Sequence, residues 1–140
     1  FDFINHEPDA CPEINFLYLE IENNDVSSYK DYLRSYFQDL GNKSVNFFTD
    51  ISNYVSYELG QPSHCYDFLS MQGTLELKKI GQKKNFITLQ DEKIVIDEGD
   101  LVFSINDEVV NLAGVMGGKN TQCKNNTTKV LLECAHFRPD

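Results

Sequence analysis

A histidine, a glutamate and a pair of polar residues are the parts of this chain that could do chemistry. His64 follows the Gly-Gln-Pro turn at residues 60–62, and an imidazole can take up or release a proton near neutral pH. A lone histidine in this position is more often a surface or core residue. However, a loop that follows a helix is also a common place for a site on a rigid support. His64 is therefore a candidate for proton handling.

Glu133 interrupts an otherwise apolar run at residues 130–135. In a strand, alternation places Glu133 on the face of Leu131 and Ala135, and the opposite face is apolar as well. Burial of a carboxylate costs several kcal/mol unless the group is hydrogen-bonded. Glu133 is therefore either on an exposed face or buried with partners, and a structural and a functional role are weighed equally.

The string GVMGG at residues 114–118 allows two interpretations. It is a weak phosphate loop, because it lacks a Gly-Lys-Ser/Thr ending and no helix signal follows. A tight turn after a strand is the simpler interpretation. In the alternative, the absence of a side chain at Gly114 lets a ligand approach the backbone, and free amides of the turn could face a developing oxyanion.

A helix over about residues 46–59 must position Ser52 and Asn53. Its apolar residues recur on one face, which comprises Phe47, Phe48, Ile51, Val55 and Leu59. Gly60 ends the helix and Pro62 prevents its continuation. Ser52 and Asn53 neighbour each other beside the apolar face, so we expect them to point sideways into a cleft.

The remaining pattern predicts an α+β domain. Residues 1–13 are predicted to form a loop or linker, residues 16–22 a strand, and Asn24-Asp25 a turn. Ser28 is the predicted N-cap of a first helix that Gly41 ends. Short strands are predicted at residues 74–80, 86–89, 93–96, 101–105, 109–115 and 129–135. We therefore expect two early helices packed on mixed or antiparallel β-sheets in a single compact domain over residues 14–140.

The charge distribution argues against autonomous nucleic-acid binding. The chain of 140 residues has a net charge of -10, of which residues 1–70 carry -9. Such a surface repels phosphate, whose neutralisation dominates nucleic-acid affinity. The local exception is a group of four lysines, at positions 78, 79, 83 and 84. They are predicted to lie at a solvated hairpin tip, and a phosphate contact is the alternative.

Four cysteines show neither a CxxC pair nor zinc-ligand spacing to a histidine, so no metal site is predicted. Reduced thiols in the cytoplasm are expected, because the chain shows no secretion signal. No apolar run approaches 18 residues, so no membrane span is predicted. The missing initiator Met and the end at Asp140 suggest a piece of a longer protein.

Three segments together resemble the editing domain of the bacterial phenylalanyl-tRNA synthetase beta subunit. They are DISNYVSYELGQPSHCYD at residues 50–67, LAGVMGG at 112–118 and LLECAHF at 131–137. DACP at residues 9–12 and DLVF at 100–103 resemble further parts of the family pattern. The resemblance implies hydrolysis of tyrosine wrongly attached to tRNA(Phe). It also implies an alpha subunit, the remainder of the beta subunit and tRNA(Phe) as partners in a heterotetramer.

The same resemblance implies that this domain uses no cofactor, because ATP and Mg²⁺ belong to the synthetic site on the alpha subunit. By position it implies that the editing pocket is lined by Ser52, Asn53, His64, Gly114 and Glu133. Glu133 would accept the hydroxyl of tyrosine, and such a pocket rejects phenylalanine because its polar groups would be left unpaired. Ser52 and Asn53 would hold the amino group or the terminal ribose. His64 and Asn53 would place the attacking water.

Several residues depart from the family pattern. Lys43, a candidate substrate-binding residue, replaces an Arg and loses its planar fork. Ser52 replaces a Thr and keeps the hydroxyl, Cys65-Tyr66 replaces Ala-Phe, and Glu13 replaces an Arg. These departures favour a second hypothesis, in which the domain is a structural module of the same subunit whose editing activity has decayed.

Overall fold

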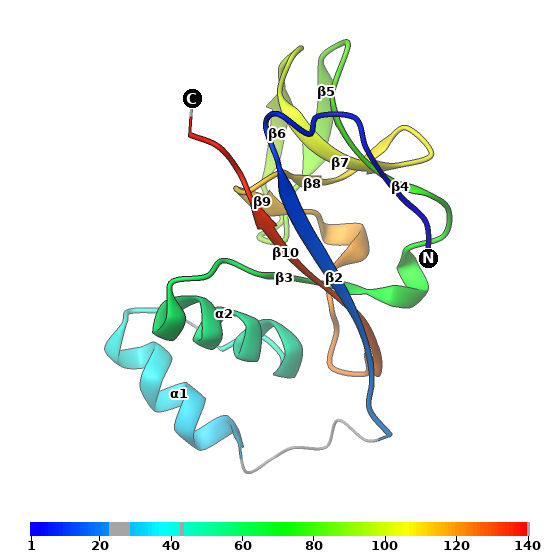
Figure 1. The fold of residues 1–140 in the computed structure, drawn as a ribbon. Helices are drawn as coiled ribbons and strands as arrows, with labels where there is room; N and C mark the ends of the chain where they lie inside the picture. The colour runs from blue at the N-terminus through cyan, green and yellow to red at the C-terminus, as the bar shows by residue number, and fades with distance from the viewer. Residues whose placement is uncertain (23–28, 43, 140) are drawn as a thin grey trace.

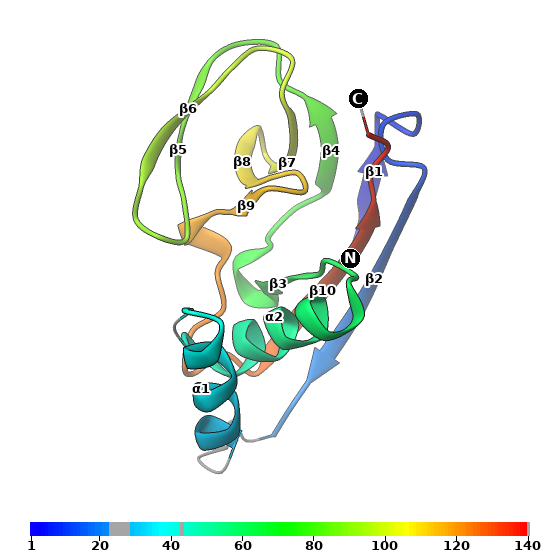
Figure 2. The same ribbon diagram turned by 90° about the vertical axis from the view of Figure 1, so that its left-hand side faces the viewer.

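Two β-sheets face each other across the main core, and a helix and a β-hairpin cover their outer faces (Figures 1 and 2). The computed structural model describes residues 1–22, 29–42 and 44–139. The first sheet has the strand order β2-β10-β3 and the second the order β1-β4-β7-β8-β9. A separate two-stranded hairpin is formed by β5 and β6.

The three-stranded sheet carries the two titratable candidates. Its strands are β2 (Glu13–Glu20), β10 (Lys129–His136) and β3 (His64–Asp67). The central strand, β10, is antiparallel to both neighbours. The register pairs Glu133 with His64 on β3 and with Phe16 on β2. Directly opposed residues in neighbouring strands are close enough to interact, so the fold brings Glu133 and His64 together across 69 positions of sequence.

The five-stranded sheet is mixed, because β1 is parallel to β4 and its other pairings are antiparallel. Its strands are β1 (Phe3–Asn5), β4 (Leu75–Lys79), β7 (Leu101–Ile105), β8 (Glu108–Leu112) and β9 (Met116–Gly117). The hairpin comprises β5 (Lys84–Ile87) and β6 (Lys93–Ile96). Short 3-10 helices follow β3, at Phe68–Ser70, and β9, at Lys119–Thr121.

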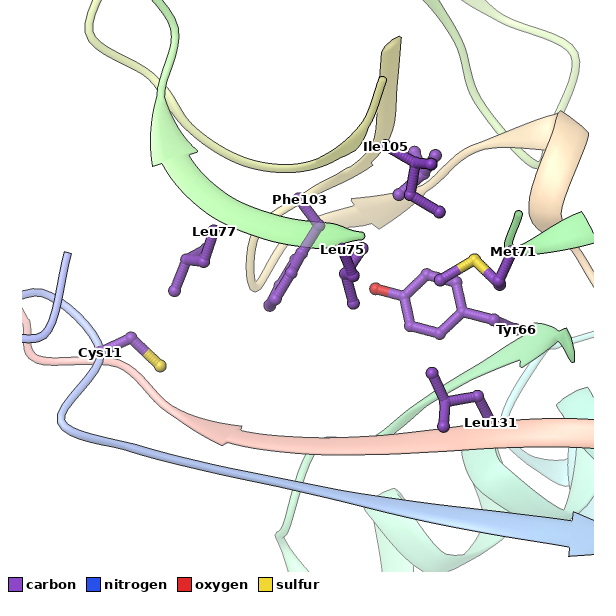
Figure 3. Close-up of a cluster of buried hydrophobic side chains, with 9 residues drawn as sticks. Cys11, Tyr66, Met71, Leu75, Leu77, Phe103, Ile105 and Leu131 are labelled. Atoms are coloured by element: carbon purple, nitrogen blue, oxygen red, sulfur yellow. The ribbon is translucent and has the colours of Figure 1, made fainter. Parts of the chain in front are cut away.

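Strand alternation explains how the layers are joined. On β7, Phe103 enters the core between the two sheets, whereas Val102 packs under the β5–β6 hairpin. On β10, Leu131 enters the core between the sheets and Val130 packs against α2 (Phe47–Leu59). Figure 3 shows Tyr66 in the first of these cores, between residues of the two sheets. The hydroxyl of Tyr66 therefore lies deep between the sheets.

The helix α2 is capped at both ends, and the sequence predicted the end at Gly60. The side chain of Asn46 accepts a hydrogen bond from the Thr49 amide as an N-cap, and Gly60 ends the helix in the left-handed region at φ 67°. Its buried residues are Phe48, Asp50 and Ser52. The predicted apolar packing face is confirmed at Phe48 and wrong at Ile51, Val55 and Leu59, which are exposed. The physical reason is that Phe48 and Ser52, one turn apart, pack against the sheet instead.

The expected fold class is confirmed, because two helices pack on mixed and antiparallel sheets in one domain. The first helix is α1 (Tyr29–Asp39), and Gly41 follows it at φ 73°. The predicted loop over residues 1–13 is wrong for Phe3–Asn5, whose backbone pairs with β4. The predicted strand over 109–115 is divided into β8, a turn and β9. The predicted turn at Asn24-Asp25 and the N-cap at Ser28 lie outside the described residues.

All four cysteines are free thiols, as expected. Cys11 and Cys123 are buried, whereas Cys65 and Cys134 are only partly buried. Among the described residues, no helix is long and apolar enough to span a bilayer.

Candidate functional site

A cavity of about 440 Å³ lies where the end of β10 meets the start of β3 and the β8–β9 turn. It is lined by Gly60, Gln61, Pro62, Ser63, His64, Asn111, Gly114, Val115, Met116, Gly117, Glu133, Ala135, His136 and Phe137. Small-ligand sites in proteins have volumes of about 300–1,000 Å³. The cavity therefore has the size of a site for a small molecule or for one end of a larger ligand.

Glu133 is a buried carboxyl group in the wall of this cavity. Glu133 is only 6% exposed to solvent. The Tyr66 hydroxyl donates a hydrogen bond of 2.8 Å to Oε1. Burial raises the pKa of Glu133 to about 7, and the hydrogen bond from Tyr66 opposes that rise. Glu133 is thus buried with a partner, and near neutral pH it exists in both protonation states.

His64 is a neutral imidazole near physiological pH, because burial lowers its pKa to about 4. Its ring meets the Tyr66 ring edge-on, with the centroids 4.4 Å apart. The Nε2 atom is buried and has no hydrogen-bond partner among the described residues. A neutral imidazole has one donor and one acceptor nitrogen. His64 can therefore exchange a hydrogen bond with a ligand or water in the cavity.

The glycines in and beside the β8–β9 turn allow the backbone of this segment to approach His64 closely. A Cβ atom on Gly117 would lie 2.3 Å from His64 Cε1, which is closer than any real contact. Gly114 adopts φ 73°, in the left-handed region that favours glycine, and a Cβ there would lie 3.1 Å from Phe137 Cδ2. Residues 114–118 therefore form a tight turn, which was the simpler of the two interpretations of this glycine string. Gly114 also lines the cavity.

The backbone amides of this turn are only partly available to a ligand. The Val115 amide donates to the Leu112 carbonyl at 2.9 Å, and the Gly118 amide donates to the Val110 carbonyl at 2.9 Å. The alternative with free amides is therefore wrong at Val115 and Gly118, because their hydrogen atoms already close the turn and the sheet.

The two polar residues of α2 lie outside the cavity lining. Ser52 is buried, and its hydroxyl lies 2.7 Å from the Ser63 hydroxyl and donates to the Ser63 carbonyl at 3.2 Å. Ser52 therefore ties the loop before His64 to α2. Asn53 is exposed on the same helix and is not among the lining residues. Lys43 lies outside the described residues.

Two further residues belong to this site and were not predicted from the sequence, Tyr66 and Asn111. Gly117 belongs to the glycine string that the sequence had already singled out. Tyr66 and Asn111 are buried and hydrogen-bonded to one another. The signal for Tyr66 was present, because it stands two positions from His64 on the same face of a strand. Asn111 gave no signal, since a single polar residue in a strand usually faces solvent.

A second cavity, of about 410 Å³, lies between the β5–β6 hairpin, β8 and the 3-10 helix after β9. Three of the charged side chains in its lining already have partners. Lys84 donates to the Asp107 carbonyl and Lys119 pairs with Asp91. Asp107 also accepts from Lys78 at 2.6 Å. Three of the four lysines near the hairpin, Lys78, Lys83 and Lys84, are thus in contact with acidic residues at the surface.

No group of three or more metal-ligating side chains occurs among the described residues. The candidate site is therefore described by its hydrogen-bonding groups, a titrating carboxyl, a neutral imidazole and a close glycine turn.

The chain belongs to the B3/4 domain family, whose model matches residues 10–140. Curated relatives are phenylalanine–tRNA ligase beta subunits. The chain is 32% identical over 120 residues to that of Fusobacterium nucleatum, which covers 86% of this chain and 15% of the relative. The beta subunit of Chlamydia trachomatis serovar D is 34% identical over 135 residues, which cover 96% of this chain and 17% of that relative. The beta subunit of Streptomyces avermitilis is 38% identical over 111 residues, which cover 77% of this chain and 13% of that relative.

The chain thus spans about one-sixth of the length of the curated relatives it matches. A solved structure, an N-terminal fragment of the phenylalanyl-tRNA synthetase beta subunit from Pyrococcus horikoshii, has a similar fold. The TM-score is 0.67 at 9% identity, over 97% of this chain and 43% of that one. At this identity the likeness supports the fold alone.

Proposed function

We propose that this chain is the editing domain of a phenylalanine–tRNA ligase beta subunit. Its reaction is the hydrolysis of the ester that joins tyrosine to tRNA(Phe). The observation that carries the proposal is a buried carboxyl group, Glu133, in the wall of a cavity of small-ligand size, opposite His64 in the strand register. The similarity to beta subunits supports the choice of substrate.

Discrimination between tyrosine and phenylalanine rests on Glu133. The two amino acids differ by one hydroxyl group, which a carboxylate can accept as a hydrogen-bond donor. A buried acceptor left unpaired by phenylalanine costs about 1–3 kcal/mol or more, because it loses water without gaining a partner. A site built to bind the hydroxyl therefore rejects the analogue that lacks it far better than an apolar pocket rejects an extra group.

Hydrolysis rests on His64. An aminoacyl ester is already activated, so a held water molecule can attack it without a covalent intermediate. The Nε2 atom of His64 has no partner among the described residues and can position this water or the ribose hydroxyl beside the ester. Gly114 and Gly117 let the ligand and the imidazole approach the turn. Ser52 supports the loop that carries His64, through Ser63.

The tRNA is held mainly by other parts of the enzyme in this proposal. A net charge of -10 opposes contact with the phosphate backbone. The partners are the remainder of the beta subunit and an alpha subunit, in a cytoplasmic heterotetramer. ATP and Mg²⁺ act at the synthetic site on the alpha subunit. Asn53, exposed on α2 and outside the cavity lining, contacts the terminal ribose in this proposal, and Lys43 is a substrate-binding residue.

The test is calorimetric titration of the 140-residue chain with tyrosine and with phenylalanine at pH 7. We expect tyrosine to bind at least about tenfold more tightly, because a hydrogen bond to a charged acceptor contributes about 1.5–3 kcal/mol. Equal affinity for the two amino acids would contradict the assignment of Glu133 as the acceptor.

A structural role in the same subunit is the second candidate. One observation favours it: Ser52 and Asn53, expected at the pocket, are outside the cavity lining. In that case the domain would bind neither amino acid, and the full enzyme would release tyrosine from tRNA(Phe) no faster than water does.

A further inference from the structure

Three buried side chains form a directed chain of hydrogen bonds that ends on the acceptor of the proposed site. Asn111 donates from Nδ2 to the Tyr66 hydroxyl oxygen at 3.0 Å. The Tyr66 hydroxyl donates to Glu133 Oε1 at 2.8 Å. All three residues are at most 6% exposed. They come from β8, β3 and β10, so the chain crosses from one sheet to the other.

The direction of this chain follows from the chemistry of its first member. An amide nitrogen can only donate, so the Tyr66 oxygen must accept from Asn111. The single hydrogen of the Tyr66 hydroxyl is then available for Glu133. This donation occupies Oε1 and leaves Oε2 without a hydrogen bond from any described residue. Because Oε2 is not fully buried, it can face the cavity that Glu133 lines.

We infer that Tyr66 is the positioning residue for the acceptor of this site: it holds Glu133 by Oε1, so that Oε2 receives a hydroxyl donor from the ligand. The inference deepens the proposed function and rests on it for the identity of the ligand. It also assigns a role to the Tyr66 hydroxyl, because a phenylalanine at position 66 would leave Glu133 without this donor.

The hydrogen bond favours the acceptor form of Glu133. A hydroxyl that donates to a carboxylate stabilises the ionised state, whereas burial disfavours it. His136 lines the same cavity at the exposed end of β10. Among the described residues, the other titratable groups that act on Glu133 or oppose it in the register are His64 and the thiols of Cys11, Cys65 and Cys134. None of these is a cation at neutral pH, since His64 is neutral there. Tyr66 is therefore the group that opposes the effect of burial on Glu133.

The experiment compares the 140-residue chain with its Tyr66→Phe variant, which keeps the ring and removes only the hydroxyl. The first readout is the titration of the Glu133 carboxyl carbon by NMR in the unliganded chain. The midpoint is expected to rise by about one pH unit in the variant, because a charged acceptor loses one donor. The matched control is Tyr57→Phe, at an exposed tyrosine on α2.

The second readout is the affinity for L-tyrosine at pH 7 and pH 8.5. Tyr66→Phe is expected to weaken binding about tenfold at pH 7. Part of this loss should be recovered at pH 8.5, where Glu133 is ionised in both proteins. A purely structural defect would not recover with pH. Should Tyr66→Phe fail to fold, Asn111→Ala keeps the Tyr66 hydroxyl but frees its direction, and a smaller change of the same sign is expected.

The two readouts separate the two claims. An unchanged Glu133 midpoint in Tyr66→Phe would overturn the role of Tyr66, whatever the ligand. An upward shift in a chain that binds no tyrosine would support the positioning of Glu133 and count against the proposed substrate. A shift together with pH-dependent recovery of L-tyrosine binding supports both.

Discussion

Two cavities among the described residues have nearly equal volumes, about 440 and 410 Å³, but their titratable groups differ in how they are partnered. In the cavity between the β5–β6 hairpin and β8, Lys84, Lys119 and Asp107 already contact groups of opposite charge or carbonyl oxygens. In the cavity at β3 and β10, His64 Nε2 is buried without a partner, and Glu133 keeps an accessible oxygen.

This difference identifies the candidate site, whereas size does not. Exposed ion pairs contribute about 0–1 kcal/mol and are found on most surfaces. A buried polar group that the fold does not satisfy is a cost to the fold and is retained where a ligand can satisfy it. The comparison therefore predicts that the same kind of substitution, such as the removal of a carboxylate, will change tyrosine binding in the cavity at β3 and β10 and not in the other cavity.

The largest expected effect is loss of ligand discrimination in Glu133→Ala. Removal of the acceptor should weaken tyrosine binding by about tenfold to a hundredfold and leave phenylalanine binding nearly unchanged. Asp107→Ala, in the other cavity, is the matched removal of a carboxylate and should change neither affinity. Calorimetric titration of both variants with both amino acids measures the effect. Equal losses in the two variants would remove the distinction between the cavities.

A neighbouring pair of glycines gives the second test, because each faces a different cavity. A Cβ on Gly117 would collide with His64, at 2.3 Å from Cε1. A Cβ on Gly118 would lie 2.8 Å from both Phe86 Cε2 and the Val110 carbonyl oxygen. Both alanine variants should lose about 1–3 kcal/mol of stability through overpacking.

Only Gly117→Ala should also lower tyrosine binding, by at least about tenfold, since His64 must move out of its position. Gly118→Ala, measured on the folded protein, should bind within about twofold of the unsubstituted chain. Denaturant unfolding and titration of the same samples separate the two effects. Normal tyrosine binding by Gly117→Ala would show that the position of His64 does not matter.

The third prediction concerns pH. Burial raises the pKa of Glu133 in the folded state from 4.5 to about 7, so the unfolded chain releases this proton first and stability falls progressively as pH rises from 4.5 to 7. Glu133→Gln removes this ionisation and should stabilise the fold by up to about 3 kcal/mol at pH 8. The gain should fall below about 1 kcal/mol at pH 5, where less of the cost is present.

Asp107→Asn should have the opposite sign in the same measurement. Hydrogen bonding and attraction from Lys78 lower the pKa of Asp107, so its charge stabilises the fold above its unfolded pKa. Loss of that charge should lower stability slightly at pH 8. Denaturant unfolding of both variants at pH 5 and pH 8 tests the pair. A destabilised Glu133→Gln at pH 8 would mean that the carboxylate is held by interactions stronger than its burial cost.

The smallest effect is expected for Asn53→Ala. Asn53 is exposed on α2 and outside the cavity lining, so tyrosine binding should change by less than about twofold. Titration with tyrosine measures this change directly. A tenfold loss would show that the ligand extends over α2 and that the cavity alone does not define the site.

Much of this fold followed from local patterns. The helix end at Gly60, the strand over β10 and the tight turn at Gly114 were predicted correctly because each depends on nearby residues. β1 was missed, since three residues give no periodicity and the strand is held by parallel pairing with β4, 72 positions away. The packing face of α2 was predicted correctly at Phe48. It was wrong at Ile51, Val55 and Leu59, because the polar Ser52, one turn after Phe48, is buried instead.

The candidate site was predictable in its parts and not in its arrangement. Glu133 was recognised because a carboxylate in an apolar run requires partners. Its partner Tyr66 was not, because the contact depends on a strand register that brings positions 66 and 133 together. Asn53 was expected at the pocket from its place beside Ser52. The two neighbours point in different directions on the helix, and only Ser52 faces the loop before His64.

The measurement that tests the central claim most directly is deacylation of Tyr-tRNA(Phe) by the full heterotetramer that carries this domain. The unsubstituted enzyme is compared with His64→Ala, Glu133→Ala and the control Asp107→Ala. We predict hydrolysis well above the spontaneous rate, reduced about a hundredfold or more by His64→Ala and strongly by Glu133→Ala, and unchanged in Asp107→Ala. Hydrolysis at the spontaneous rate in the unsubstituted enzyme would contradict the account and leave the domain a structural part of the subunit.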